Sequence, residues 1–141
     1  MTIVVDVSKT HQTTDGFGIS EFFGRAGNIK SLKADAQKEA LDLLFDPTTG
    51  AGLSILRNGI GSGVSSGFSI ETNSPGEPLA APKYQWDGID NSQIWLTKEA
   101  MARRLRYTYA DAWSAPGFMK TNGKDSDAST ANGTMIVKEN Y

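Results

Sequence analysis

Bulky apolar residues cluster in three short segments of this chain, at residues 17–20, 53–57 and 107–113. Glycine or proline borders each segment within three residues. Short apolar segments with such borders are typical of buried β-strands. The pattern therefore predicts three strands. In the first of them we expect Phe17 and Ile19 to be buried, with the neighbouring glycines permitting close packing.

Residues 32–45, between the first two of these segments, show helical spacing. The expected buried face consists of apolar residues that recur at this spacing, and one more that widens it: Leu32, Ala36, Ala40, Leu41, Leu43 and Leu44. Charged residues fall mainly on the opposite face. Ser31 is a suitable N-cap, and Asp46 followed by Pro47 is expected to end the helix.

A second helix is expected after residues 90–92, the tripeptide Asp-Asn-Ser, any of which can cap a helix. The apolar side of this helix would contain Ile94, Trp95, Met101, Ala102 and Leu105. Residues 21–28 and the long glycine- and serine-rich segment 58–77 are expected to be loops. The β-branched segment 2–7 predicts one further strand.

The order of these elements is strand, helix, strand, loop, helix, strand, which predicts an α/β fold with a parallel sheet and right-handed crossovers. In such sheets, ligands bind beyond the carboxyl ends of the strands. We therefore expect residues 21–25, 57–62 and 113–120 to lie together on one rim. The length of 141 residues fits a single domain.

Charge and composition exclude several classes of function. The chain has 14 Lys and Arg against 16 Asp and Glu, and this near balance argues against a nucleic-acid partner. With no cysteine and only His11, neither a metal site, a cofactor nor a Ser-His-Asp triad is expected. No apolar run is long enough for a membrane partner, and the first residues lack the basic region of a signal peptide.

Two rim residues could contribute to binding. Arg57 directly follows a buried strand, so we expect it to pair with a carboxylate. It could orient a catalytic carboxylate, or it could equally form an ordinary rim salt bridge. Trp113 ends a strand, where an indole could stack on a sugar ring, although core packing is the simpler interpretation.

The rim also carries three carboxylates, at Glu21, Asp87 and Asp111. Retaining glycoside hydrolysis needs two carboxyl groups about 5–5.5 Å apart. Nothing in the spacing of these three shows that any two of them meet. The simpler interpretation is that each is solvated or caps a nearby backbone.

Three rim segments taken together resemble glycoside hydrolase family 30. They are Asp-Gly-Phe-Gly-Ile-Ser at 15–20, Leu-Ser-Ile-Leu-Arg-Asn at 53–58, and Ala-Trp-Ser-Ala-Pro-Gly-Phe-Met-Lys-Thr-Asn-Gly at 112–123. The resemblance covers residues 13–124. It is greatest to endo-xylanases and endo-β-1,6-galactanases, and glucosylceramidases are more distant.

The resemblance implies a (β/α)8 barrel with a small β side domain and a retaining mechanism that uses two glutamates, at the ends of the fourth and seventh barrel strands. This sequence stops after the third, so no catalytic residue is expected in it. By resemblance, Arg57 supports the nucleophile, Trp113 lines the site of the cleaved sugar, and Arg25 matches a loop arginine that could bind an acidic side group. Gly67 stands where many relatives have an aspartate, so one sugar-hydroxyl contact is expected to be missing.

These interpretations divide the chain into three parts. Residues 1–12 are the N-terminal strand of the side domain, residues 13–124 are the N-terminal portion of the barrel with about three strands and two helices, and residues 125–141 form a divergent, flexible tail. We expect the N-terminal fragment of a retaining hydrolase, extracellular by family resemblance and inactive alone.

Its expected partners are a polysaccharide substrate, either xylan or β-1,6-galactan, and the missing C-terminal part of the barrel. Two alternatives stay open. One is a non-catalytic carbohydrate-binding or inert product, and the other is an enzyme acting on glucosylceramide-type glycosides.

Overall fold

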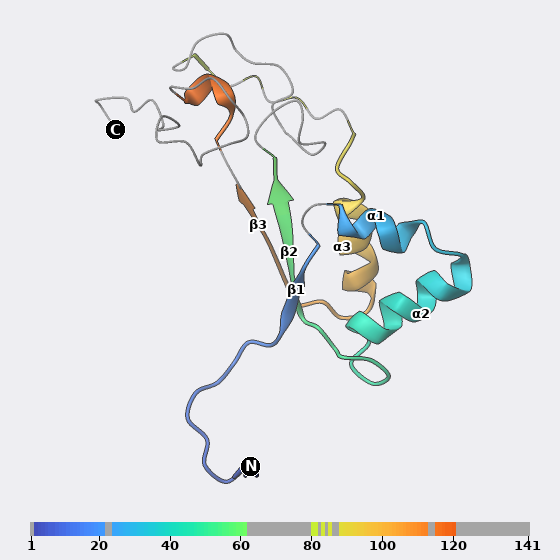
Figure 1. Cartoon of the computed structure of the whole chain (residues 1–141), viewed down its shortest axis with the longest axis vertical. Coiled ribbons are helices and arrows are strands. Elements are labelled where there is room, and N and C mark those ends of the chain that lie inside the picture. Colours follow the sequence, from blue (N-terminus) through green and yellow to red (C-terminus); the bar gives the residue numbers. More distant parts are fainter. Residues whose placement is uncertain are drawn as a thin grey trace.

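The computed structural model describes residues 2–21, 24–61, 80–81, 83, 85, 88–112 and 115–120. Its elements in chain order are β1 (Gly18–Ser20), α1 (Arg25–Lys30), α2 (Ala34–Phe45), β2 (Ile55–Ile60), α3 (Gln93–Ala102), β3 (Tyr107–Ala112) and a short 3-10 helix (Gly117–Met119). The three α-helices lie together on one side of the strands (Figure 1). Among the described residues, no helix has both the length and the apolar character needed to cross a membrane.

The sheet confirms the prediction of three parallel strands. Their spatial order is β1-β2-β3, and both pairings are parallel. The register places Gly18 beside Ile55, and Ile55 in turn beside Tyr107. The carboxyl ends of all three strands therefore share one rim, as the sequence order predicts.

Gly18 allows β1 to pack closely against β2. A Cβ atom at this position would lie 2.5 Å from the carbonyl oxygen of Ile55, so a larger residue would push the strands apart. The expectation for Phe17 is wrong, because its side chain is 77% exposed. Phe17 contacts the neighbouring chain segment through its backbone instead, because its carbonyl accepts hydrogen bonds from the N–H groups of Ser54 and Ile55.

The hydrophobic core lies between the sheet and the helices. Its buried members come from all three helices and β2: Ala26, Leu41, Phe45, Leu56, Leu96 and Ala100. Leu56, the second residue of β2, is fully buried. This arrangement leaves the other face of the sheet uncovered by the described helices (Figure 1).

Helix α2 confirms the prediction of a helix here but corrects its start and its buried face. Ser31 is not the N-cap, because it ends α1, and its N–H donates to the Gly27 carbonyl. Lys33 takes the N-cap position. The buried face centres on Leu41 and Phe45, one turn apart, and α2 is therefore rotated away from the predicted face. As a result, Ala36 and Leu43 are exposed, and Leu32, which precedes the helix, is exposed as well.

Helix α3 begins directly after residues 90–92, as predicted, but buries a different face. Leu96 and Ala100 are buried together with the polar Gln93. Three residues expected on the apolar side are exposed instead: Ile94, Met101 and Ala102. Trp95 and Leu105 pack against the core, as expected. The error arises because a polar residue, Gln93, occupies the first buried position of the helix.

Residues 21–28 were expected to be a loop, but α1 occupies part of this segment. The helix follows Gly24, which adopts the left-handed conformation with φ 76°. Ala26 is buried and Ile29 packs against the core three residues later. Such a short helix buries only two apolar side chains, so it shows no clear hydrophobic period in the sequence.

Residues 2–7 do not form the expected strand. The side chains of Ile3, Val4, Val5 and Val7 are all exposed, and no described strand lies beside them to accept their hydrogen bonds. Assignment of residues 1–12 to a side domain stays a prediction. Most of the predicted 58–77 loop and the whole 125–141 tail lie outside the described residues, although the first residues of that loop belong to β2 instead.

Candidate functional site

Polar and aromatic side chains gather on the sheet face that points away from the helices. Side chains alternate along a strand, and Leu56 is buried toward the helices, so Ile55 and Arg57 point to the opposite face. The register extends this face to Ser20 on β1 and Tyr109 on β3. We call this surface the open face; its members are Ser20, Ile55, Arg57, Tyr107, Tyr109 and Asp111.

Arg57 and Asp111 form a two-pronged ion pair on the open face. The Arg57 Nε donates to Asp111 Oδ1 over 2.7 Å, and Nη2 donates to Oδ2 over 2.8 Å. Asp111 lies two residues beyond Tyr109, the register partner of Arg57. The pair confirms that Arg57 has a carboxylate partner. It also corrects the view of Asp111 as a merely solvated or capping group.

Each member of this pair stabilises the charged form of the other. The hydrogen bond from Arg57 lowers the pKa of Asp111, and the bond to Asp111 raises the pKa of Arg57, with burial opposing both shifts. Both groups therefore stay charged across the neutral range. Arg57 lies inside β2, level with the last residue of β1, rather than after its strand as expected, and it reaches Asp111 near the carboxyl end of β3. A permanent cation is therefore held below the rim where the fold binds ligands.

A shallow cavity of about 300 Å³ adjoins the ion pair on the open face. It is lined by Gly18, Ile19, Ser20, Ile55, Arg57 and Tyr109. Tyr107 and Tyr109 are half exposed beside it. The open face therefore combines aromatic rings with a fixed cation, a combination suited to packing against sugar rings and binding their oxygens.

Glu21 lies at the carboxyl end of β1 but has different surroundings from Asp111. Its side chain is only 1% exposed, and neither carboxyl oxygen has a hydrogen-bond partner in the described part of the chain. Burial raises the pKa of Glu21 to about 7, the charge of Asp90 adds to the shift, and the nearby Ala26 backbone N–H opposes it. The expectation of a solvated Glu21 is wrong, because its side chain is buried near the backbone at the start of α1.

The remaining predicted site residues are not brought to the ion pair by any described contact. Arg25 is exposed at the first position of α1, and its backbone N–H donates to the Glu21 carbonyl over 3.1 Å. Its role toward an acidic sugar stays a prediction. Trp113 and Asp87 lie outside the described residues.

Two polar side chains behind β2, which sequence reasoning missed, fix the rim from the helix side. The Gln93 Oε1 accepts a hydrogen bond from the Gly59 N–H over 2.6 Å. Asn58 donates from Nδ2 to the hydroxyl oxygens of Thr97 on α3 and Thr108 on β3. For Asn58, the signal in the sequence was a polar residue inside an otherwise apolar strand segment.

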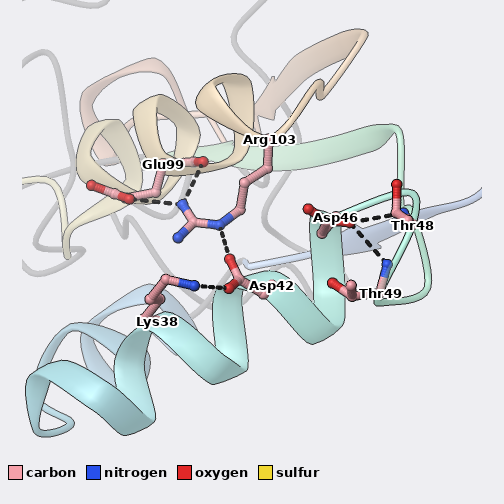
Figure 2. Close-up of polar contacts among 7 residues, drawn as sticks. All are labelled: Lys38, Asp42, Asp46, Thr48, Thr49, Glu99 and Arg103. Carbon is pink, nitrogen blue, oxygen red and sulfur yellow. Dashed lines mark hydrogen bonds and ion pairs between the residues drawn. The ribbon is translucent and has the colours of Figure 1, made fainter.

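A second arginine ion pair ties α2 to α3 on the far side of the sheet (Figure 2). The Arg103 Nε donates to Asp42 Oδ1 over 2.6 Å, and Nη1 donates to Glu99 Oε2 over 2.9 Å. Lys38 also pairs with Asp42 along α2. This cluster braces the helices and lies on α2 and α3, away from the open face, so it offers a control for the Arg57 pair.

A scan against protein-family models finds no match. A search of solved structures finds the catalytic domain of GH30 xylanase C from Talaromyces cellulolyticus, with 55% identity over 83% of this chain and a TM-score of 0.72. The chain belongs to glycoside hydrolase family 30.

Two further solved structures share the fold with this family 30 chain. A conserved exported protein from Bacteroides fragilis is 23% identical over 84% of this chain, with a TM-score of 0.61, and the match covers 27% of that protein. An endo-β1,6-glucanase is 22% identical over 82% of this chain, with a TM-score of 0.60, and the match covers 25% of it. At these identities the two matches show a shared fold and nothing further.

The family 30 chain spans about a quarter of the length of the solved structures it matches, since it covers 26% of the xylanase C catalytic domain. Its three parallel strands and their helices correspond to a portion of the TIM barrel, as the sequence resemblance implies. In a closed barrel of this type the helices form the outer ring and the opposite sheet face points inward. The open face thus corresponds to the barrel interior.

Proposed function

We propose that this chain is the N-terminal portion of the catalytic barrel of a retaining glycoside hydrolase that cleaves β-linked plant cell-wall polysaccharide, with xylan as the first substrate to test. The observation that carries the proposal is Arg57, whose guanidinium is paired and permanently charged on the face that corresponds to the barrel interior. The 55% identity to a xylanase catalytic domain supports the choice of substrate.

In this proposal Arg57 binds and orients, and the reacting carboxyls come from elsewhere in the barrel. Retaining cleavage needs one carboxyl group that protonates the leaving oxygen and a second that attacks the anomeric carbon. A fixed guanidinium beside a nucleophilic carboxylate keeps that carboxylate ionised. The family resemblance assigns both glutamates to barrel strands four and seven.

Neither described rim carboxylate is suited to replace them. Asp111 is held ionised by Arg57, so it is a poor proton donor at neutral pH. Glu21 does hold a proton up to about pH 7, but it is buried where substrate has no access. The isolated chain is therefore expected to give no turnover.

Two finer features of the proposal concern substrate and location. Arg25, exposed at the start of α1, would bind an acidic side group on the polysaccharide. We infer secretion from the substrate class alone, since cell-wall polysaccharide lies outside the cell. β-1,6-galactan is the second substrate to test.

The test is a reducing-sugar assay on the purified 141-residue chain, alone and mixed with a polypeptide that carries the remaining barrel of xylanase C. We expect no release from xylan or β-1,6-galactan by the chain alone, and release by the mixture. Turnover by the chain alone that is lost in Glu21→Gln or Asp111→Asn would overturn the proposal. So would a properly assembled but inactive complex.

A non-catalytic carbohydrate-binding role is the second candidate, favoured by the half-exposed Tyr107 and Tyr109 beside the cavity. Isothermal titration of the chain alone with xylo-oligosaccharides distinguishes the two. Binding that is lost in Tyr109→Ala, together with an inactive mixture, would favour the second candidate.

A further inference from the structure

The Arg57–Asp111 pair constrains the direction of the guanidinium as well as its charge. Here both carboxylate oxygens are used, each on a different nitrogen of the same guanidinium edge. Because the guanidinium is planar, two contacts to one edge fix the orientation of its plane as well as its position.

We propose that Asp111 is a positioning residue, which holds the Arg57 guanidinium in the orientation that the active site needs. This inference rests on the proposed function. Asp111 is on β3 and Arg57 on β2, so the pair also locks the plane of the guanidinium to two adjacent barrel strands. The Nε–Nη2 edge faces Asp111, and the planar group must therefore direct its opposite edge away from Asp111.

Removing the carboxylate would leave Arg57 charged but without the two contacts on its Nε–Nη2 edge. Because an arginine side chain has several rotatable bonds, the plane of the guanidinium could then turn away from the orientation that Asp111 gives it. Misplacement of a catalytic contact by about 1 Å can lower the rate about 100-fold. Ground-state binding, by contrast, depends on contacts spread over the whole substrate.

The first experiment measures steady-state kinetics on xylan with the chain complemented by the remaining barrel of xylanase C. We expect Asp111→Asn to lower kcat about 10- to 100-fold while KM changes less than about twofold. Arg57→Lys removes the two-pronged contact to Asp111. Adding Asp111→Asn to Arg57→Lys should therefore cause little further loss of kcat. Asp42→Asn disrupts the equivalent arginine pair on the helix side and should leave kcat unchanged.

The second experiment uses NMR of arginine Nε–H groups in the 141-residue chain alone. The Arg57 Nε–H should exchange slowly with water in the unaltered chain and rapidly in Asp111→Asn, whereas Asp42→Asn should affect only Arg103. An unchanged Arg57 signal in Asp111→Asn, or an unchanged kcat in an active complex, would overturn the positioning role. Loss of the Arg57 signal together with an inactive unaltered complex would instead overturn the proposed function.

Discussion

The side chain of Gln93 completes the hydrogen bonding of β2 where β1 no longer reaches. The Arg57 carbonyl accepts the Glu21 N–H, the last hydrogen bond between the two segments among the described residues. Gly59 is two residues further along β2, so its N–H points to the same side, beyond the end of β1. There the Gln93 Oε1 accepts it at 2.6 Å. A side chain from α3 thus replaces a strand at the rim.

Replacing Gln93 should therefore destabilise the fold. Gln93→Ala leaves the buried Gly59 N–H without an acceptor, and we expect a loss of about 1–3 kcal/mol in the free energy of unfolding. Urea denaturation followed by circular dichroism measures it. Gln37→Ala is the matched control, because the Gln37 amide donates to the Lys30 carbonyl at an exposed position. Equal losses in the two variants would contradict the role of Gln93.

Gly18 should be intolerant of even a methyl group. Gly18→Ala would place a Cβ atom 2.5 Å from the Ile55 carbonyl oxygen, and separating the strands should cost about 1–3 kcal/mol. Gly27→Ala is the control, since the nearest atom to its Cβ is 4.0 Å away and the position is helical. That change should be neutral or stabilise by up to about 1 kcal/mol. A stable Gly18→Ala chain would contradict the observed strand spacing.

Glu21 should make stability depend on pH. Its pKa is raised to about 7 in the folded chain, so the folded state binds a proton more tightly than the unfolded state. Stability is therefore greatest below about pH 4.5 for this group, falls as pH rises, and is fully reduced above about pH 7, by roughly 3 kcal/mol. Denaturation midpoints at pH 5 and pH 8 measure the effect.

Glu21→Gln should remove most of this pH dependence, because the amide cannot ionise. Glu39→Gln, at an exposed position on α2, should leave the dependence as it is in the unaltered chain. An equally steep fall between pH 5 and pH 8 in Glu21→Gln would show that another group is responsible.

The sequence was sufficient to predict the parallel sheet but not the details of helix packing. Strand segments at residues 17–20, 53–57 and 107–113 were recognisable because apolar runs and their borders are local signals. The rotation of α2 and the burial of Gln93 depend on which faces meet in three dimensions. Those contacts leave no periodic trace in a single sequence, so Leu43 and Met101 were misplaced.

The candidate site, too, could be predicted from the sequence only in part. Arg57 could be predicted to pair with a carboxylate, because a charge next to a buried apolar segment needs a partner, although Arg57 lies inside β2 and not after it. That the partner is Asp111 follows from the register of β2 against β3, which sequence spacing does not specify. Glu21 was expected to be solvated because α1 was missed, and the carboxyl group is buried near the Ala26 N–H of that helix.

The most direct test of the central claim compares two arginine variants in the chain complemented by the remaining xylanase C barrel. We expect the unaltered complex to hydrolyse xylan and the 141-residue chain alone to be inactive. Arg57→Ala should lower kcat about 100- to 1,000-fold, as expected for loss of a preorganised charge in an active site. Arg103→Ala, which removes the helix-side pair, should lower stability but keep kcat. Equal kcat values for Arg57→Ala and the unaltered complex would contradict the account.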